Sequence, residues 1–244
     1  MADKQIPFSA PMVRALLEGH KTQTRRLLRP QPSKPWGSAC MDGPRWWTCD
    51  SLTLEVIEEW RLPWSKGDRL YVREAWRTMD GLDPLSGKQI AEKCAEAGYR
   101  RAWAPIQYEA DGGRDNWIRE PHGWGTEPGR YRHARFMPRW ALRLTLIVTD
   151  VRVQQLQEIS EADAMAEGGT SENGEVPFGE GYADAYWFNH GQNHGNSFDT
   201  PRESFRDLWN SLHGRDAWGA NPLVVAISFD VIRANIDSVG SRNG

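Results

Sequence analysis

The longest stretch of alternating apolar and polar residues in the chain runs from Ala141 to Leu156. Successive side chains of a β-strand point to opposite faces, so alternation of this kind is typical of a strand that lies in a sheet. The stretch is longer than an ordinary strand. It therefore predicts one bent strand or two strands of a curled sheet, and the rest of the fold must be built around that sheet.

Two helices have clear start and stop signals. Ser9 can cap a helix over residues 10–18, and Gly19 is suited to the position that ends it. Thr200, followed by proline and by glutamate at the third helical position, predicts a second helix that ends at Gly214. Weaker patterns predict further helices at Lys88–Ala97 and Ser160–Gly168, and strands at Lys21–Leu28, Leu52–Trp60, Arg69–Trp76, Ile106–Ala110 and Pro222–Ile232.

Two segments lack such patterns. Residues 30–50 are rich in Pro, Gly and Trp and are expected to be irregular, while residues 170–199 are expected to form a long mobile loop over a pocket. Apolar segments at both ends of the chain indicate one core. We therefore expect a single domain over residues 1–234, followed by a flexible tail at 235–244.

Composition narrows the class of protein. The chain has 244 residues, 39% of them hydrophobic and 26% charged, which is typical of a globular protein. It contains neither a long apolar run nor a signal-peptide pattern, so a cytoplasmic location without membrane contact is expected. The three cysteines form no close pair and the six histidines are scattered. Neither a metal nor a cofactor is predicted, and a net charge of −3 is unlike that of a general DNA-coating protein.

The segment from Gly19 to Arg26 holds the most informative polar residues. Lys21, Thr24 and Arg26 follow directly after the first predicted helix. On a regular strand Thr24 and Arg26 share one face, and Lys21 joins them only if a bulge or the helix–strand corner redirects its side chain. Such residues are also common on any solvated sheet, so their spacing alone does not establish a pocket.

The pattern Gly19-x-Lys21-x-x-Thr24-x-Arg26 resembles the signature of the ASCH domains, which belong to the PUA-like β-barrel superfamily. Most members have glutamate where this chain has Thr24. The threonine is more similar to small amidohydrolases that remove acetyl from 4-acetylcytidine. Blocks spread over nearly the whole chain, such as Met137-Pro-Arg-Trp140, also resemble uncharacterised phage and prophage proteins. The resemblance implies an α+β, mainly β fold, with a curled sheet or barrel and short helices at its rim.

The resemblance also implies roles for individual residues. In the similar hydrolases a lysine, a threonine and a glutamate form the catalytic set, which corresponds to Lys21, Thr24 and Glu167. A threonine hydroxyl is a weak nucleophile that needs a nearby base, and a partly desolvated lysine is suited to that task. Arg26 is then expected to hold a phosphate or an oxyanion. Glu74, between two arginines, is a second candidate carboxylate for substrate binding.

A run of basic residues forms a second candidate surface. Aromatic residues are interleaved with it, and together they suit phosphate contacts combined with base stacking, although a solvated face is nearly as good an interpretation. Arg139 and Trp140 are the candidate binding residues in this run. Its basic members are Arg130, Arg132, His133, Arg135, Arg139 and Arg143, and its aromatic members are Tyr131, Phe136 and Trp140.

Four functions are compatible with these patterns. The first is a binder of RNA or of nucleotides without chemistry, and the second is an amidohydrolase that acts on an acylated nucleobase or modified nucleoside. The third is a ribonuclease of the same fold, and the fourth is a phage accessory or assembly protein. Neither repeats nor coiled-coil heptads, which are frequent in phage structural proteins, occur in the sequence.

Overall fold

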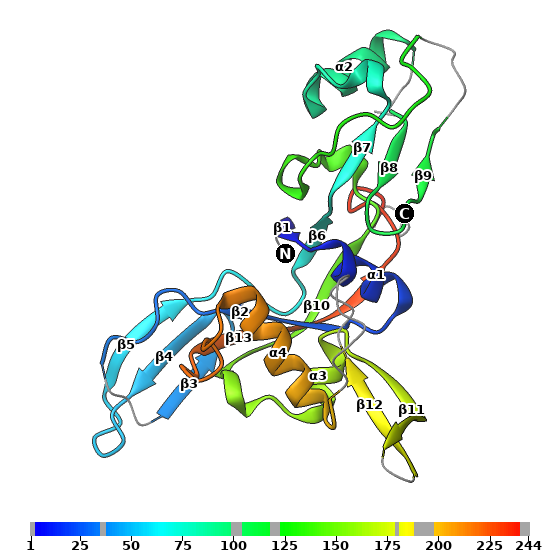
Figure 1. The fold of residues 1–244 in the computed structure, drawn as a ribbon. Coiled ribbons are helices and arrows are strands. Elements are labelled where there is room, and N and C mark those ends of the chain that lie inside the picture. Colours follow the sequence, from blue (N-terminus) through cyan, green and yellow to red (C-terminus); the bar gives the residue numbers. More distant parts are fainter. Residues whose placement is uncertain are drawn as a thin grey trace. The chain divides into compact units, whose positions relative to one another are not determined.

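The computed structural model describes residues 3–34, 38–98, 104–117, 123–178, 181–187 and 198–239 (Figure 1). Its helices are α1 (Ala10–Glu18), α2 (Gly87–Glu96), α3 (Glu161–Ala166) and α4 (Pro201–His213). Its strands are β1 (Asp3–Pro7), β2 (Gln23–Leu27), β3 (Ser38–Asp42), β4 (Arg45–Cys49), β5 (Val56–Arg61), β6 (Arg69–Arg73), β7 (Trp76–Thr78), β8 (Ile106–Tyr108), β9 (Arg114–Asp115), β10 (Thr145–Gln155), β11 (Thr170–Phe178), β12 (Gly181–Trp187) and β13 (Leu223–Ile232).

The protein is α+β with more strand than helix, as the sequence predicts. The largest sheet has the strand order β1-β6-β10-β13-β2, with β1 parallel to β6 and β2 antiparallel to β13. The edge strands of this sheet, β1 and β2, are not paired with each other. Within the described residues the sheet is therefore open rather than closed into a barrel. The other sheets are small, with the orders β3-β4-β5, β7-β8-β9 and β11-β12.

The described part of the chain groups into two compact units. The first unit comprises Glu18–Asp68 and Ile147–Asp230. The described residues of the second unit fall in 3–17, 69–146 and 231–239. The boundaries between the units fall within β10 and within β13, so the chain passes from one unit to the other along these strands.

In the first unit, α3 and α4 pack together and their apolar faces close a core with β13. Phe205, Leu208 and Trp209 of α4 contact Leu156 and Val224 there. These α4 residues recur at helical spacing, which is why burial of one face stabilises this helix. The Thr200 side chain accepts a hydrogen bond from the Glu203 N–H at the start of α4, so the predicted cap is confirmed.

In the second unit, the core forms around Trp76 of β7. Helix α2 contributes Ile90 and Cys94, β8 contributes Ile106, and Ile236 comes from beyond β13. All four side chains are fully or almost fully buried. Ile236 lies in the segment that the sequence predicts to be a flexible tail, and its side chain is packed into this core.

Both segments predicted to be irregular contain strands. Within 30–50, β3 and β4 pair in antiparallel fashion, and β4 also pairs with β5. Trp46 and Trp60 face each other across β4 and β5, with 4.6 Å between ring centroids. Within 170–199, β11 pairs with β12 in place of a loop. Residues 179–180 and 188–197 of this segment lie outside the described residues.

None of the helices in the described ranges is long and apolar enough to cross a membrane. Within the same ranges, no three His, Cys, Asp or Glu side chains gather closely enough to hold a metal ion.

Candidate functional site

The segment that carries the Gly19–Arg26 motif turns sharply out of α1 and enters β2. Gly19 has φ of +83°, a left-handed conformation that favours glycine and ends the helix. Lys21 then forms an isolated bridge with Glu167, and β2 follows with Thr24 opposite Ile227 of β13. Glu167 is the residue that ends α3, whose start is capped by the Ser160 hydroxyl. Two chain segments far apart in sequence therefore meet at this point.

Lys21 and Glu167 form a buried ion pair in the first unit. The Lys21 ammonium donates to Glu167 Oε2 at 2.9 Å and to the Glu167 backbone oxygen at 2.7 Å. The Lys21 side chain is 1% exposed and that of Glu167 5%. Burial lowers the pKa of the Lys21 ammonium, and the charge of Glu167 opposes that shift. A lysine in this state is closer to a usable base than a solvated one.

Three further side chains extend this pair into a network. Arg25 donates to Glu167 Oε1 at 3.0 Å and to Asp163 Oδ2 at 2.9 Å. It also donates to Gln23 Oε1 at 2.5 Å, and Gln23 donates to Asp163 Oδ1 at 3.2 Å. Burial opposes ionisation of Asp163, but Arg25 and Arg152 hold the pKa of this carboxyl below its usual value. We call Lys21, Gln23, Arg25, Asp163 and Glu167 the Lys21–Glu167 cluster.

The residues of the motif fall on two sets of strand positions. Lys21, Gln23 and Arg25 are two apart, and their side chains all reach the α3 residues of the cluster. Thr24 and Arg26 occupy the alternate positions. Thr24 is buried, and burial lowers the pKa of the Arg26 guanidinium while the charge of Glu167 opposes that shift. Sequence reasoning singled out Arg26, whereas it is Arg25 that pairs with Glu167. The two-residue period counted from Lys21 was the signal for Gln23 and Arg25.

Glu74, the other candidate carboxylate, belongs to the second unit and is paired differently. Both of its oxygens accept hydrogen bonds from Arg143 at 2.8 Å. The same guanidinium bridges to Asp111 and lies 3.8 Å above the ring of Tyr108. Burial raises the pKa of Glu74, and Arg143 opposes that shift. This fully paired arrangement is typical of a structural ion pair.

The basic run divides into residues with structural partners and residues that line a cavity. Arg139 pairs with Asp3 and Asp237. Trp140 donates to the Gly87 carbonyl at 3.2 Å. Arg132 is 7% exposed and donates to the carbonyls of Leu82, Asp83 and Leu85, where it stabilises a turn.

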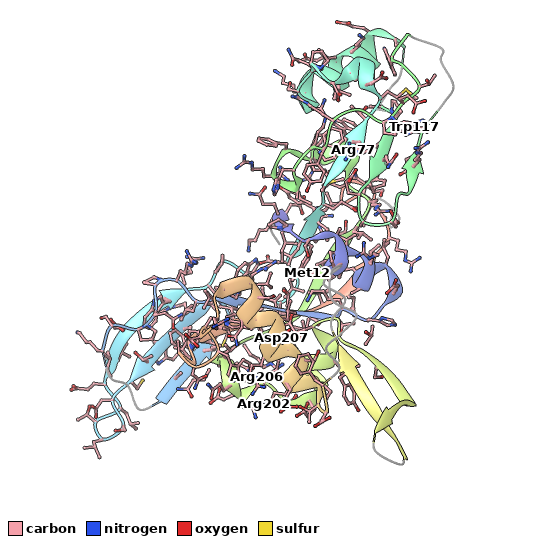
Figure 2. All side chains as sticks on the ribbon, viewed as in Figure 1. Met12, Arg77, Trp117, Arg202, Arg206 and Asp207 are labelled. Carbon is pink, nitrogen blue, oxygen red and sulfur yellow. The ribbon has the colours of Figure 1, made fainter. Side chains whose placement is uncertain are left out.

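Arg132 also lines a cavity of about 510 Å³ in the second unit, together with the members of the run at positions 130, 131, 133, 135 and 136. We call it the basic–aromatic pocket. Its volume lies in the range of roughly 300–1,000 Å³ that ligand sites occupy. The pocket lies close to β7. Arg77 of this strand is labelled in Figure 2, and its guanidinium carbon lies 5.9 Å from the ring centroid of Tyr131. The lining residues are Ser86, Gly87, Arg130, Tyr131, Arg132, His133, Arg135 and Phe136.

Local structure explains why this segment presents cations and aromatic rings to solvent. Buried side chains at Arg132, Ala134 and Met137 anchor it, and the backbone of Arg132 exchanges both of its hydrogen bonds with Trp76. The intervening side chains must therefore point outward. The Arg135 guanidinium lies 4.6 Å from the ring centroid of Phe136, an arrangement in which cation–π attraction orients both groups.

Comparison with known proteins found no matching family model, no matching curated protein and no matching solved structure.

Proposed function

We propose that the chain binds nucleic acid or nucleotides, and that the basic–aromatic pocket is the binding site. The observation that supports this proposal is the lining of one cavity by exposed arginines and by exposed aromatic rings. Guanidinium groups bind phosphate oxygens, and aromatic rings stack on bases. Both groups of a nucleotide therefore find a partner in the same pocket.

The charge of the pocket is local. The whole chain carries a net charge of −3, yet the pocket combines Arg130, Arg132 and Arg135, with Asp83 as the carboxylate beside Arg132. The α2 helix also begins at this wall with Ser86 and Gly87, and its first N–H groups add positive potential. A protein of this kind is expected to bind at one site rather than to coat a polynucleotide.

The proposal is tested by the salt dependence of RNA binding. A labelled single-stranded RNA of about twelve nucleotides should bind, with an affinity that falls as salt rises. Replacing Arg130 and Arg135 together by glutamine should make the plot of log K against log salt less steep. The magnitude of its slope should fall by about 0.7 for each phosphate that these arginines neutralise. Fluorescence anisotropy over a salt series measures both quantities.

Arg45→Gln is a matched control, because Arg45 is exposed and pairs with Glu59 in the first unit. It should leave affinity and slope unchanged. Equal weakening of binding in Arg45→Gln and in the Arg130/Arg135 variant would contradict the site assignment. The recovered RNA should be intact on a gel, since shortened RNA would favour a ribonuclease.

A second candidate function is hydrolysis of an acylated nucleobase or nucleoside at the Lys21–Glu167 cluster. The observation that favours it is a buried lysine, with its pKa lowered by burial, in hydrogen-bond contact with a carboxylate. The resemblance to ASCH domains and 4-acetylcytidine amidohydrolases stays a proposal. It is supported by the same lysine–carboxylate pair and by Thr24, which follows Lys21 by three residues. On this proposal the Thr24 hydroxyl attacks the acyl carbon and gives its proton to Lys21. Glu167 relays a proton from Lys21 to the leaving amine as the C–N bond breaks, and water then hydrolyses the threonine ester to release the acid and restore Thr24.

A further inference from the structure

Tyr131 and Phe136 differ from the other aromatic side chains whose burial the structure describes. They are 51% and 60% exposed, whereas the other aromatic side chains whose burial the structure describes are buried or half-buried. Water-exposed aromatic surface is unfavourable, and most of the described tryptophans are buried or half-buried. Both exposed rings line the basic–aromatic pocket. Two such rings in one pocket indicate a ligand that covers them.

The groups around the rings indicate what kind of ligand this is. A guanidinium lies near each ring, that of Arg77 near Tyr131 and that of Arg135 near Phe136. Arg130 and His133 lie close to the two aromatic positions in the sequence and are also exposed. The rings and the cations of this surface lie within a few residues of each other. A ligand that occupies it must therefore offer flat faces to the rings and negative charge to the cations.

The flat faces distinguish two forms of nucleic acid. In a duplex each base is stacked between its neighbours, so its face is closed to a protein ring, whereas unpaired bases can stack on aromatic side chains. A surface made only for phosphate binds both forms and needs no exposed rings. On the basis of the proposed function, we infer that the basic–aromatic pocket takes unpaired bases of a single-stranded RNA and discriminates against duplex.

The pocket wall is built to keep the rings in place before a ligand arrives. Residues 134–136 form a 3-10 turn between the buried residues Arg132 and Met137. The Arg73 guanidinium also donates to the Arg135 carbonyl at 2.9 Å. A wall held at both ends loses little conformational freedom on binding, which favours affinity for a flexible single strand.

The test compares one RNA sequence as a single strand and as a blunt duplex, over the same series of salt concentrations. Wild-type protein should bind the single strand at least about tenfold more tightly than the duplex. Replacing Tyr131 and Phe136 together by alanine should weaken single-strand binding by about tenfold or more, because alanine substitution of a stacking residue costs that much for each base. The salt slope should stay that of wild type, since no cation is removed.

Leu212→Ala is the control, because Leu212 is an exposed apolar side chain of the first unit that does not line the pocket, and this variant should bind as wild type does. Both rings are exposed, so an unchanged melting temperature is expected and checks that the alanine variant is folded. Equal affinity for strand and duplex, with no effect of the alanine variant, would overturn the inference while leaving nucleic-acid binding in place. Absence of any RNA binding by wild type would overturn the proposed function as well.

Discussion

Replacing Glu167 by alanine is expected to lower the free energy of unfolding by about 3–5 kcal/mol, because breaking a buried ion pair leaves an uncompensated charge. Glu167 accepts from both Lys21 and Arg25, whose side chains are almost completely buried. Without the carboxylate, both cations lose a partner that they cannot replace with water. Chemical denaturation monitored by tryptophan fluorescence measures the change.

Glu55→Ala is the matched control for Glu167→Ala. Glu55 is an exposed carboxylate of the same unit, and its replacement should change the free energy of unfolding by no more than about 0.5 kcal/mol. Glu167→Gln should fall between the two, because the amide oxygen still accepts one hydrogen bond but carries no charge. A Glu167→Ala variant as stable as Glu55→Ala would show that the cluster contributes nothing to the fold.

The second large effect is expected at Thr24, on the hydrolase proposal. Wild-type protein should release acetate from 4-acetylcytidine, and Thr24→Val should lower the rate by a factor on the order of 10³ or more, because a nucleophile is removed. Valine keeps the size of the buried threonine, so nucleoside binding should stay within about tenfold, or roughly 1.4 kcal/mol. Acetate is measured by a coupled assay on the full chain.

Ser171→Val is a suitable control, because Ser171 is an exposed hydroxyl residue of the same unit. It should leave acetate release unchanged. Equal release by wild type and Thr24→Val would exclude Thr24 as the nucleophile. Binding of RNA without any acetate release would leave the binder as the function of this chain.

Local signals predicted the helices well. Helix α1 begins directly after Ser9 and ends before Gly19, and the Thr200 side chain caps α4, which ends before Gly214. These signals lie next to the helix ends that they mark, so the sequence was sufficient to place both helices. The strands β3 and β4 were missed because the high Pro, Gly and Trp content of residues 30–50 indicates irregular structure, and because part of their packing comes from β5 further along the chain. Trp46 packs on Trp60 across a strand pair, and that contact cannot be read from the composition of residues 30–50.

The candidate sites were predictable only in part, for the same reason. The meeting of Lys21 with Glu167 was implied by family resemblance, and the structure does bring these two residues together, while their catalytic role stays a prediction. In the basic run, the sequence shows charge but not partners. Arg139 binds Asp3 and Asp237, and Arg143 binds Glu74, all far away in sequence. Only the three-dimensional fold separates these structural arginines from Arg130 and Arg135.

The most direct test of RNA binding at the basic–aromatic pocket is crosslinking with mapping of the attached residues. A single-stranded RNA containing 4-thiouridine is irradiated with the full chain, and the crosslinked peptides are identified by mass spectrometry. We predict attachment within residues 130–136, at Tyr131, His133 or Phe136, with competition by unlabelled single strand. Absence of crosslinks, or crosslinks confined to residues 19–28, would contradict the assignment of RNA binding to this pocket.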